Sequence, residues 1–182
     1  ILIFGPTGAV GRAAAIEAHR RGAHIWLAMR DTSKAIPGLD DSDPRYTRLY
    51  ADLSEPSTVR SAVEESGATS AFVYTLFSSP DAMASSFAAL KAGGITYVVL
   101  LSSFLVQGLA SDEKNMQSFL PRVHSSTESA LYVSAIPYAA LRPWYFNSNV
   151  LWYTAGIKNS AVDLLYPELK HDYLAPSDIG IV

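Results

Sequence analysis

The sequence predicts an α/β fold in which helices flank a doubly wound, parallel sheet. Short apolar segments with the character of strands alternate with helix-favouring segments along the 182 residues. The apolar segments are almost continuously hydrophobic, as expected of parallel strands buried on both faces. The first of them leads into a glycine-rich turn and then an Ala-rich stretch. Strand, glycine turn and helix, in that order, open a Rossmann fold.

Six strands are expected, at residues 1–4, 24–29, 48–51, 71–75, 97–101 and 138–142. The helices between them are expected at residues 12–21, 56–65, 81–91 and about 123–134. Gly22 and Gly67 stand where the first two helices should end, and Pro56 suits the first turn of the second helix. Ser54 is the expected N-cap of that second helix. Because ligands of such sheets bind beyond the carboxyl ends of the strands, functional residues are expected there.

Composition excludes several classes of function. The net charge of −3 gives no electrostatic case for binding nucleic acid. The chain has no cysteine, which excludes thiolate metal sites, and the spacing of its histidines predicts no other metal site. No apolar run approaches the roughly 20 residues of a membrane span, and no signal peptide is recognised. We therefore expect a cytoplasmic protein that binds neither membrane nor nucleic acid.

The glycine turn, Gly5-Pro6-Thr7-Gly8-Ala9-Val10-Gly11, predicts a site for the diphosphate of a dinucleotide. Gly5 suits the tight turn, Gly8 leaves room for a ligand near the backbone, and Gly11 lets the helix pack on the strand. The N–H groups that open the helix then face the phosphates. The expected contacts with the cofactor in this turn are Gly5, Thr7, Gly8, Ala9, Val10 and Gly11.

The residue after the second strand predicts which dinucleotide binds. Such sites normally have an acid there, which binds the 2′-hydroxyl of the adenosine ribose, whereas this chain has Arg30. An arginine can pair bidentately with a 2′-phosphate, and Lys34 can add a second positive charge. The sequence therefore predicts NADPH/NADP⁺ as the cofactor. In the alternative interpretation, Arg30 faces solvent and the neighbouring Asp31 binds the ribose.

The ends of the third and fourth strands supply further candidates. Asp52 and Leu53 follow the third strand and are assigned to the adenine end of the cofactor, although Asp52 can equally cap the following turn. Thr75 and Leu76 end the fourth strand, where topology brings them near the ribose and the nicotinamide.

Two serines end the fifth strand. Ser102 is assigned to the cofactor, and Ser103 to the carbonyl of a substrate. Serines at strand ends are also common turn formers, so a purely structural role is the alternative for both.

The chain resembles the NmrA-like branch of the atypical short-chain dehydrogenase/reductases. The resemblance rests on the glycine turn, on Arg30, on Asp52-Leu53 and on a long downstream match. That match comprises His124-Ser125-Ser126-Thr127-Glu128, Leu131, Ser134-Ala135-Ile136-Pro137-Tyr138, Leu141-Arg142-Pro143, Phe146, Asn149 and Pro176-Ser177-Asp178-Ile179-Gly180. Because the family includes quinone and isoflavone reductases as well as redox sensors without turnover, the resemblance does not decide the chemistry.

The resemblance also implies a division of the chain. Residues 1–150 would form a Rossmann domain that binds NADP(H), and residues 151–182 would begin a small region that covers the substrate. Family members normally continue well beyond this point, so we expect the substrate region to be incomplete here.

The catalytic Tyr-x-x-x-Lys pair of most short-chain reductases has no convincing counterpart. Its spacing occurs only from Tyr166 to Lys170, after the sixth strand and beside Pro167, which is unfavourable to the required helix. His124 is the predicted catalytic acid, because imidazole titrates near neutrality and the family has Lys or His at this place. The alternative is a surface ion pair between His124 and Glu128, one helical turn later.

Aromatic and amide side chains crowd residues 142–149, just after the sixth strand. Their position borders the nicotinamide and the substrate, and their rings would suit a small aromatic substrate such as a quinone or a polyketide-like molecule. Ordinary core packing is the alternative for several of them. The predicted substrate contacts are Ser103, His124, Tyr145, Phe146 and Asn149.

Two functions are therefore open from the sequence. The first is an NADPH-dependent oxidoreductase that transfers hydride to a carbonyl, quinone or enone of a small aromatic molecule. The second is a redox-sensing regulator that binds NADP(H) without turnover. The missing Tyr-x-x-x-Lys pair favours the sensor, and the aromatic residues after the sixth strand favour the enzyme.

Overall fold

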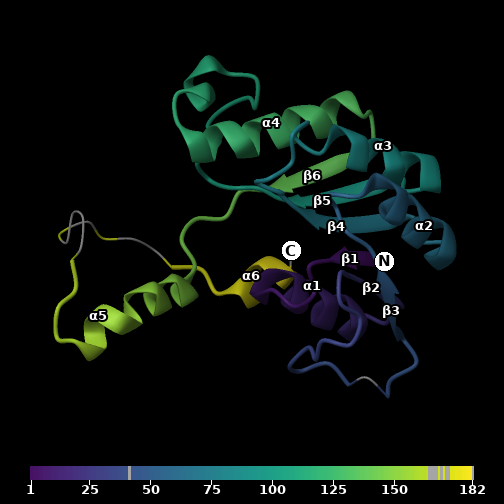
Figure 1. Cartoon of the computed structure of the whole chain (residues 1–182), viewed down its shortest axis with the longest axis horizontal. Helices are drawn as coiled ribbons and strands as arrows, with labels where there is room; N and C mark the ends of the chain where they lie inside the picture. Colours follow the sequence, from purple (N-terminus) through teal and green to yellow (C-terminus); the bar gives the residue numbers. More distant parts are fainter. Residues whose placement is uncertain (41, 164–167, 169, 171–172, 182) are drawn as a thin grey trace.

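The computed structural model describes residues 1–40, 42–163, 168, 170 and 173–181. Within these residues one parallel sheet contains β1 (Leu2–Phe4), β2 (Ile25–Met29), β3 (Tyr46–Tyr50), β4 (Ser70–Tyr74), β5 (Tyr97–Leu101) and β6 (Tyr138–Leu141). The strand order is β3-β2-β1-β4-β5-β6. The predicted doubly wound Rossmann fold is thereby confirmed, with the reversal of strand order between β1 and β4 (Figure 1).

Helices cover both faces of this sheet (Figure 1). One face carries α2 (Pro56–Ser66), α3 (Ala84–Gly93) and α4 (Phe119–Val133), and the other carries α1 (Ala9–Arg20) and α6 (Pro176–Ile181). The 3-10 helix η1 (Glu113–Met116) lies in the connection before α4. The 3-10 helix η2 (Asn147–Tyr153) and α5 (Thr154–Lys158) form an arm that projects away from the sheet. No helix in the described part of the chain is long and apolar enough to cross a membrane.

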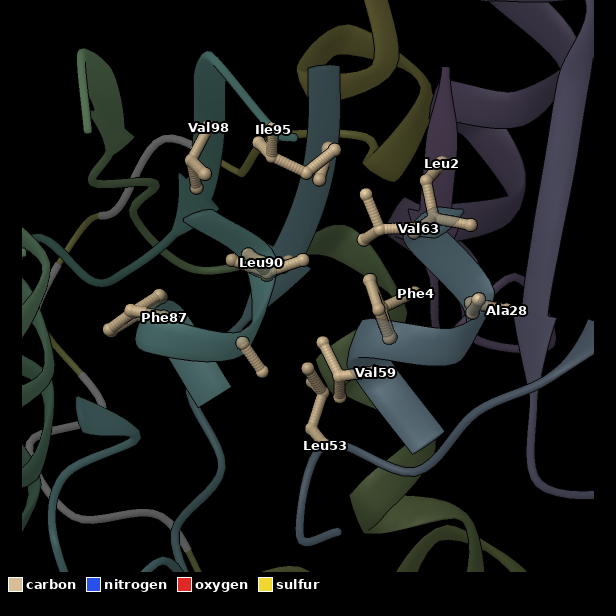
Figure 2. Close-up of a cluster of buried hydrophobic side chains, with 14 of the residues drawn as sticks. Leu2, Phe4, Ala28, Leu53, Val59, Val63, Phe87, Leu90, Ile95 and Val98 are labelled. Carbon is tan, nitrogen blue, oxygen red and sulfur yellow. The ribbon is translucent and has the colours of Figure 1, made fainter. Parts of the chain in front are cut away.

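The two faces of the sheet have separate hydrophobic cores, because successive side chains of a strand point to opposite faces. Leu2 and Phe4 of β1 belong to the larger core, under α2, α3 and α4, whereas Ile3 belongs to the smaller core, under α1. Figure 2 shows the larger core, where Val59 of α2 and Phe87 of α3 pack in the same cluster as Phe4. These cores support the strands whose carboxyl ends share one edge of the sheet.

The observed strands begin and end within one residue of the predictions, except β3, which begins two residues earlier. The helices differ more. The glycine turn continues directly into α1, where the Arg12 N–H already donates to the Gly8 carbonyl, so this helix begins at Ala9 and not at residue 12. Ala82 and Met83 have positive φ, so α3 begins only at Ala84. The fourth helix, α4, begins at Phe119, one turn before the predicted start.

The predicted N-cap of α2, Ser54, is wrong. Its N–H and hydroxyl both donate to the Asp52 carboxylate, at 2.8 and 2.7 Å, so Ser54 belongs to the preceding turn. Glu55 is the N-cap residue, and its side chain forms no capping hydrogen bond.

The larger core predicts a large loss of stability on truncation of Phe87, which is fully buried. Phe87→Ala should lower the free energy of unfolding by about 3–5 kcal/mol, because it removes a buried ring and leaves a cavity. Urea denaturation followed by circular dichroism measures this change. Leu109→Ala is the control, since Leu109 is 71% exposed, and an equal loss in both variants would contradict the packing described here.

Candidate functional site

The turn between β1 and α1 has the conformation that its glycines permit. Gly5 has a φ of +68°, and its carbonyl accepts a hydrogen bond of 3.0 Å from the Gly8 N–H. A Cβ at Gly11 would collide with the Gly5 carbonyl oxygen, so only glycine lets α1 approach the turn this closely. No side chain caps α1 and no acid lies in its first turn, which leaves its N-terminal N–H groups open to an anion. This cradle fits a diphosphate.

Three adjoining cavities lie along the carboxyl edge of the sheet. The Arg30 cavity, of about 250 Å³, lies beside the ends of β1, β2 and β3. The glycine-turn cavity, of about 430 Å³, follows residues 5–11. The His124 cavity, of about 830 Å³, lies beyond the ends of β4, β5 and β6. Tyr74, at the end of β4, lines all three.

The Arg30 cavity brings together the residues predicted for the adenosine end. Arg30 and Lys34 line it with Asp52 and Leu53. Within the described chain, the Arg30 guanidinium forms no hydrogen bond or ion pair. The Asp31 carboxylate instead accepts hydrogen bonds from the N–H and hydroxyl of Ser33, at 2.9 and 2.6 Å, and these hold the pKa of Asp31 below its usual range. Arg30 and Asp31 both line this cavity, and the Ser33 bonds engage only Oδ1 of Asp31, so either side chain can meet a ligand there.

Asp52 has the turn-capping role that the sequence left open, through its bonds to Ser54, and it lines the Arg30 cavity as well. The two roles are compatible, because the bonds to Ser54 engage a single carboxylate oxygen, Oδ1.

The His124 cavity gathers the residues predicted for the nicotinamide and the substrate. It is walled largely by aromatic and aliphatic side chains. The predicted residues that line it are Thr75, Leu76, Ser102, Ser103, His124, Tyr145, Phe146 and Asn149, together with Arg30, which also lines the Arg30 cavity. The glycine-turn cavity is lined by Gly5, Thr7, Gly8, Ala9, Val10 and Gly11, so the residues predicted from separate strand ends form one continuous edge.

His124 lies half-buried on α4 and faces the end of β4. Its Nδ1 is 3.1 Å from Oγ1 of Thr75, and its ring meets the Phe77 ring edge-on, with centroids 5.3 Å apart. Burial lowers the pKa of His124 from its ordinary value of 6.5, against the opposing effect of the Glu128 charge. The ring is therefore held largely neutral near pH 7.

The predicted alternative of a surface ion pair between His124 and Glu128 is wrong. Glu128 is only 3% exposed, and its carboxylate accepts two hydrogen bonds from Arg142, Nε to Oε1 at 3.0 Å and Nη2 to Oε2 at 2.6 Å. The Ser102 hydroxyl donates to the same Oε1 at 2.5 Å. This cluster, the Glu128 clamp, fastens α4 to the ends of β5 and β6 and so fixes the position of His124.

Two residues of this region had no role in the sequence prediction. Arg142 belongs to the matched Leu-Arg-Pro segment. It directly follows β6, and the preceding helix α4 carries the acid Glu128, so this sequence pattern could have predicted an ion pair between them. Tyr74 lies one residue before the predicted Thr75, and nothing in the local pattern indicated which way its ring points.

The other predicted residues of the His124 cavity have structural partners too. Ser103 forms a turn, in which its hydroxyl accepts a hydrogen bond of 3.3 Å from the Leu105 N–H. Phe146 packs partly against the smaller core and also lines the His124 cavity. The Trp144 ring contacts Phe104, with centroids 3.5 Å apart, and widens the aromatic wall.

Two further expectations concern other residues. Tyr166, of the rejected Tyr-x-x-x-Lys spacing, lies outside the described residues. Among the residues that are described, no group of three or more His, Cys, Asp or Glu side chains is placed to hold a metal ion.

Residues 5–156 match a family of proteins described as NAD(P)H-binding. The chain belongs to this family, in the NmrA-like branch of the atypical short-chain dehydrogenase/reductases, as the sequence motifs predicted. It is 37% identical over 190 residues to a nitrogen metabolite regulation-like protein, bik4, of Gibberella fujikuroi. That alignment covers 99% of this chain and 58% of the relative.

A second curated relative is a (4-alkanoyl-5-oxo-2,5-dihydrofuran-3-yl)methyl phosphate reductase of Streptomyces griseus. It is 28% identical over 185 residues, which cover 100% of this chain and 61% of the relative. The chain thus spans less than two thirds of the length of either relative.

Among solved structures, the chain is similar to the Citrobacter triphenylmethane reductase complexed with NADP(H). The TM-score is 0.77 at 16% identity, and the superposition covers 99% of this chain and 62% of the reductase. At this identity the likeness supports the fold alone.

The Glu128 clamp predicts a large cost for losing one partner. Glu128→Ala should lower the free energy of unfolding by about 3 kcal/mol, because it leaves the Arg142 guanidinium without its buried counter-charge. Urea denaturation measures the loss. Glu64→Ala is the matched control, since it removes the exposed Arg60–Glu64 pair, which contributes little. Similar losses in the two variants would show that the clamp does not brace the site.

Proposed function

We propose that the chain is the cofactor-binding part of an NADPH-dependent oxidoreductase that transfers hydride to a carbonyl, quinone or enone of a small aromatic molecule. The observation that carries the proposal is that three cavities adjoin along one sheet edge: one follows the glycine turn, one holds an imidazole among aromatic rings, and Arg30 lines both that cavity and the third. Together the cavities offer a cationic group, open helix N–H groups and an aromatic wall, which suit the 2′-phosphate, the diphosphate and the nicotinamide of a phosphorylated dinucleotide. Residues 1–150 would form the cofactor domain of a cytoplasmic enzyme, and residues 151–182 would begin the substrate region.

In this proposal the cofactor spans the three cavities. The N–H groups at the start of α1 hold the diphosphate, and Arg30 with Lys34 holds the 2′-phosphate. Asp52 and Leu53 border the adenine, while Thr75, Leu76 and Ser102 border the nicotinamide side. The hydroxyl of Ser102 is engaged by Glu128, so we assign its contribution to the backbone and to the shape of the cavity.

The substrate would occupy the rest of the His124 cavity. When bound, the reduced nicotinamide supplies the hydride, which adds to the electron-poor carbon of the substrate. The Thr75 hydroxyl donates to the Leu101 carbonyl at 3.3 Å, so it accepts a hydrogen bond from Nδ1–H of His124. Nε2 then carries the second hydrogen when the ring is protonated, and the imidazolium would give this proton to a substrate oxygen. Ser103, Tyr145, Phe146 and Asn149 would hold the ring of the substrate, and the surrounding aromatic side chains exclude water.

Two of the relatives support this chemistry by their names. The Streptomyces relative is a reductase of an oxo-dihydrofuran, and the Citrobacter protein is a triphenylmethane reductase. Both names denote reductases of small ring-containing molecules, which is the kind of substrate that an aromatic-walled cavity favours.

The second candidate is a redox-sensing regulator that binds NADP(H) without turnover. It is favoured by the name of the Gibberella relative, a regulation-like protein, and by the lack of a convincing Tyr-x-x-x-Lys pair. NADPH oxidation measured against a panel of quinones, enones and aromatic ketones separates the two functions. Turnover supports the reductase, and tight NADPH binding with no turnover supports the sensor.

The assignment of Arg30 predicts a change of cofactor preference. Arg30→Asp should weaken NADPH binding at least tenfold and leave NADH binding equal or stronger, because it replaces the partner of the 2′-phosphate with an anion. Titration calorimetry with both nucleotides measures the ratio. Arg60→Asp, on the far helix α2, is the control for a change of net charge. An unchanged preference for NADPH in Arg30→Asp would refute the assignment.

The role of His124 predicts a pH dependence. Only the protonated imidazole loses a proton readily, and burial holds the pKa of His124 below 6.5. The rate of turnover should therefore rise as the pH falls from 8 toward 5. His124→Ala should lose about 10²-fold in turnover and lose this pH dependence, while it still binds NADPH. Intact turnover in His124→Ala would exclude the acid role.

A further inference from the structure

Tyr74 occupies the point where the strand order of the sheet reverses. It is the last residue of β4, the neighbour of β1, and the crevice between these two strands is the switch point of the fold. It also lines the Arg30 cavity, the glycine-turn cavity and the His124 cavity. A ligand that extends through all three cavities therefore borders this side chain in each of them.

The ring of Tyr74 is packed against the glycine turn. A Cβ built on Gly5 would lie 2.8 Å from Cε1 of Tyr74, so the ring occupies the space that a side chain at position 5 would need. The ring is half-buried, and it also packs against the larger core. The glycine turn and the larger core therefore both hold the ring in place. The ring offers a fixed, flat surface to a ligand.

Tyr74 shares the Arg30 cavity with Arg30 and Asp52. Burial raises its pKa above the ordinary value of 10, and the charges of Arg30 and Asp52 act on it in opposite directions. Both of these residues line the Arg30 cavity. Within the described chain, the Tyr74 hydroxyl has no hydrogen-bond partner. Every buried side-chain oxygen in that part of the chain has a partner, so the Tyr74 hydroxyl is not buried and is open to the cavity. It offers a protonated donor to whatever binds beside Arg30.

We infer that Tyr74 contacts the cofactor directly: its ring supports the ribose and diphosphate between Gly5 and Arg30, and its hydroxyl donates a hydrogen bond to an oxygen of the adenosine ribose or its 5′-phosphate. This inference rests on the proposed function, since it takes NADPH as the ligand. Tyr74 would then contribute to the affinity for the adenosine half of the cofactor, although it lies outside the glycine turn. A flat ring and a single donor suit this place, because the ribose and phosphates present oxygen acceptors above it.

The test compares Tyr74→Phe and Tyr74→Leu with the unaltered full chain by titration calorimetry. The titrants are NADPH and 2′,5′-ADP, which has the adenosine and both phosphates but no nicotinamide. Tyr74→Phe removes only the hydroxyl and should weaken both ligands by a similar factor, about five- to tenfold. Tyr74→Leu also removes the flat ring and should weaken both ligands further. Circular dichroism checks that the variants are folded.

Tyr132→Phe is the matched control, because Tyr132 is exposed on α4 and lines none of the three cavities. It should bind both ligands as the unaltered chain does. Unchanged binding by folded Tyr74→Phe would overturn the hydroxyl contact. A loss with NADPH but not with 2′,5′-ADP would overturn its placement at the adenosine end. If the unaltered chain binds neither ligand, the proposed function itself fails, and this inference fails with it.

Discussion

The close approach of α1 to the carboxyl end of β1 is the constraint on which the rest of the site depends. It requires a left-handed Gly5 and the absence of a side chain at Gly11, since any Cβ there would strike the Gly5 carbonyl. Hydrophobic packing of β1 between two cores holds the strand in place. The result is a helix N-terminus with open N–H groups at the centre of the sheet edge, and the three cavities are arranged around it.

The sheet brings segments that are far apart in the sequence together around the start of α1. Arg30 follows β2, Thr75 follows β4, and α4 places His124 beside Thr75. The Glu128 clamp stabilises the contact between His124 and Thr75, because its buried carboxylate accepts three hydrogen bonds and so joins α4 to the ends of β5 and β6. The edge thus has a cationic recess beside an aromatic chamber, and Arg30 lines both. This difference between the two regions suits an extended ligand that has an anionic part and an aromatic part.

Local pattern was sufficient to predict the strands and the glycine turn, because apolar runs and φ-permissive glycines are properties of short segments. It was also sufficient to predict that residues at separate strand ends meet, since parallel strands share one carboxyl edge. It was not sufficient for Glu128, whose partners lie 14 and 26 residues away in Arg142 and Ser102. The early start of α4 and the direction of Tyr74 likewise depend on tertiary packing, which the local sequence does not encode.

The central claim is that a phosphorylated dinucleotide lies along this edge, over the start of α1. A crystal structure of the full chain grown with NADPH tests it most directly. The account predicts electron density for the diphosphate against the N–H groups of residues 9–11, with the 2′-phosphate at Arg30. Density for the nucleotide at another place, or with the 2′-phosphate turned away from Arg30, would contradict it.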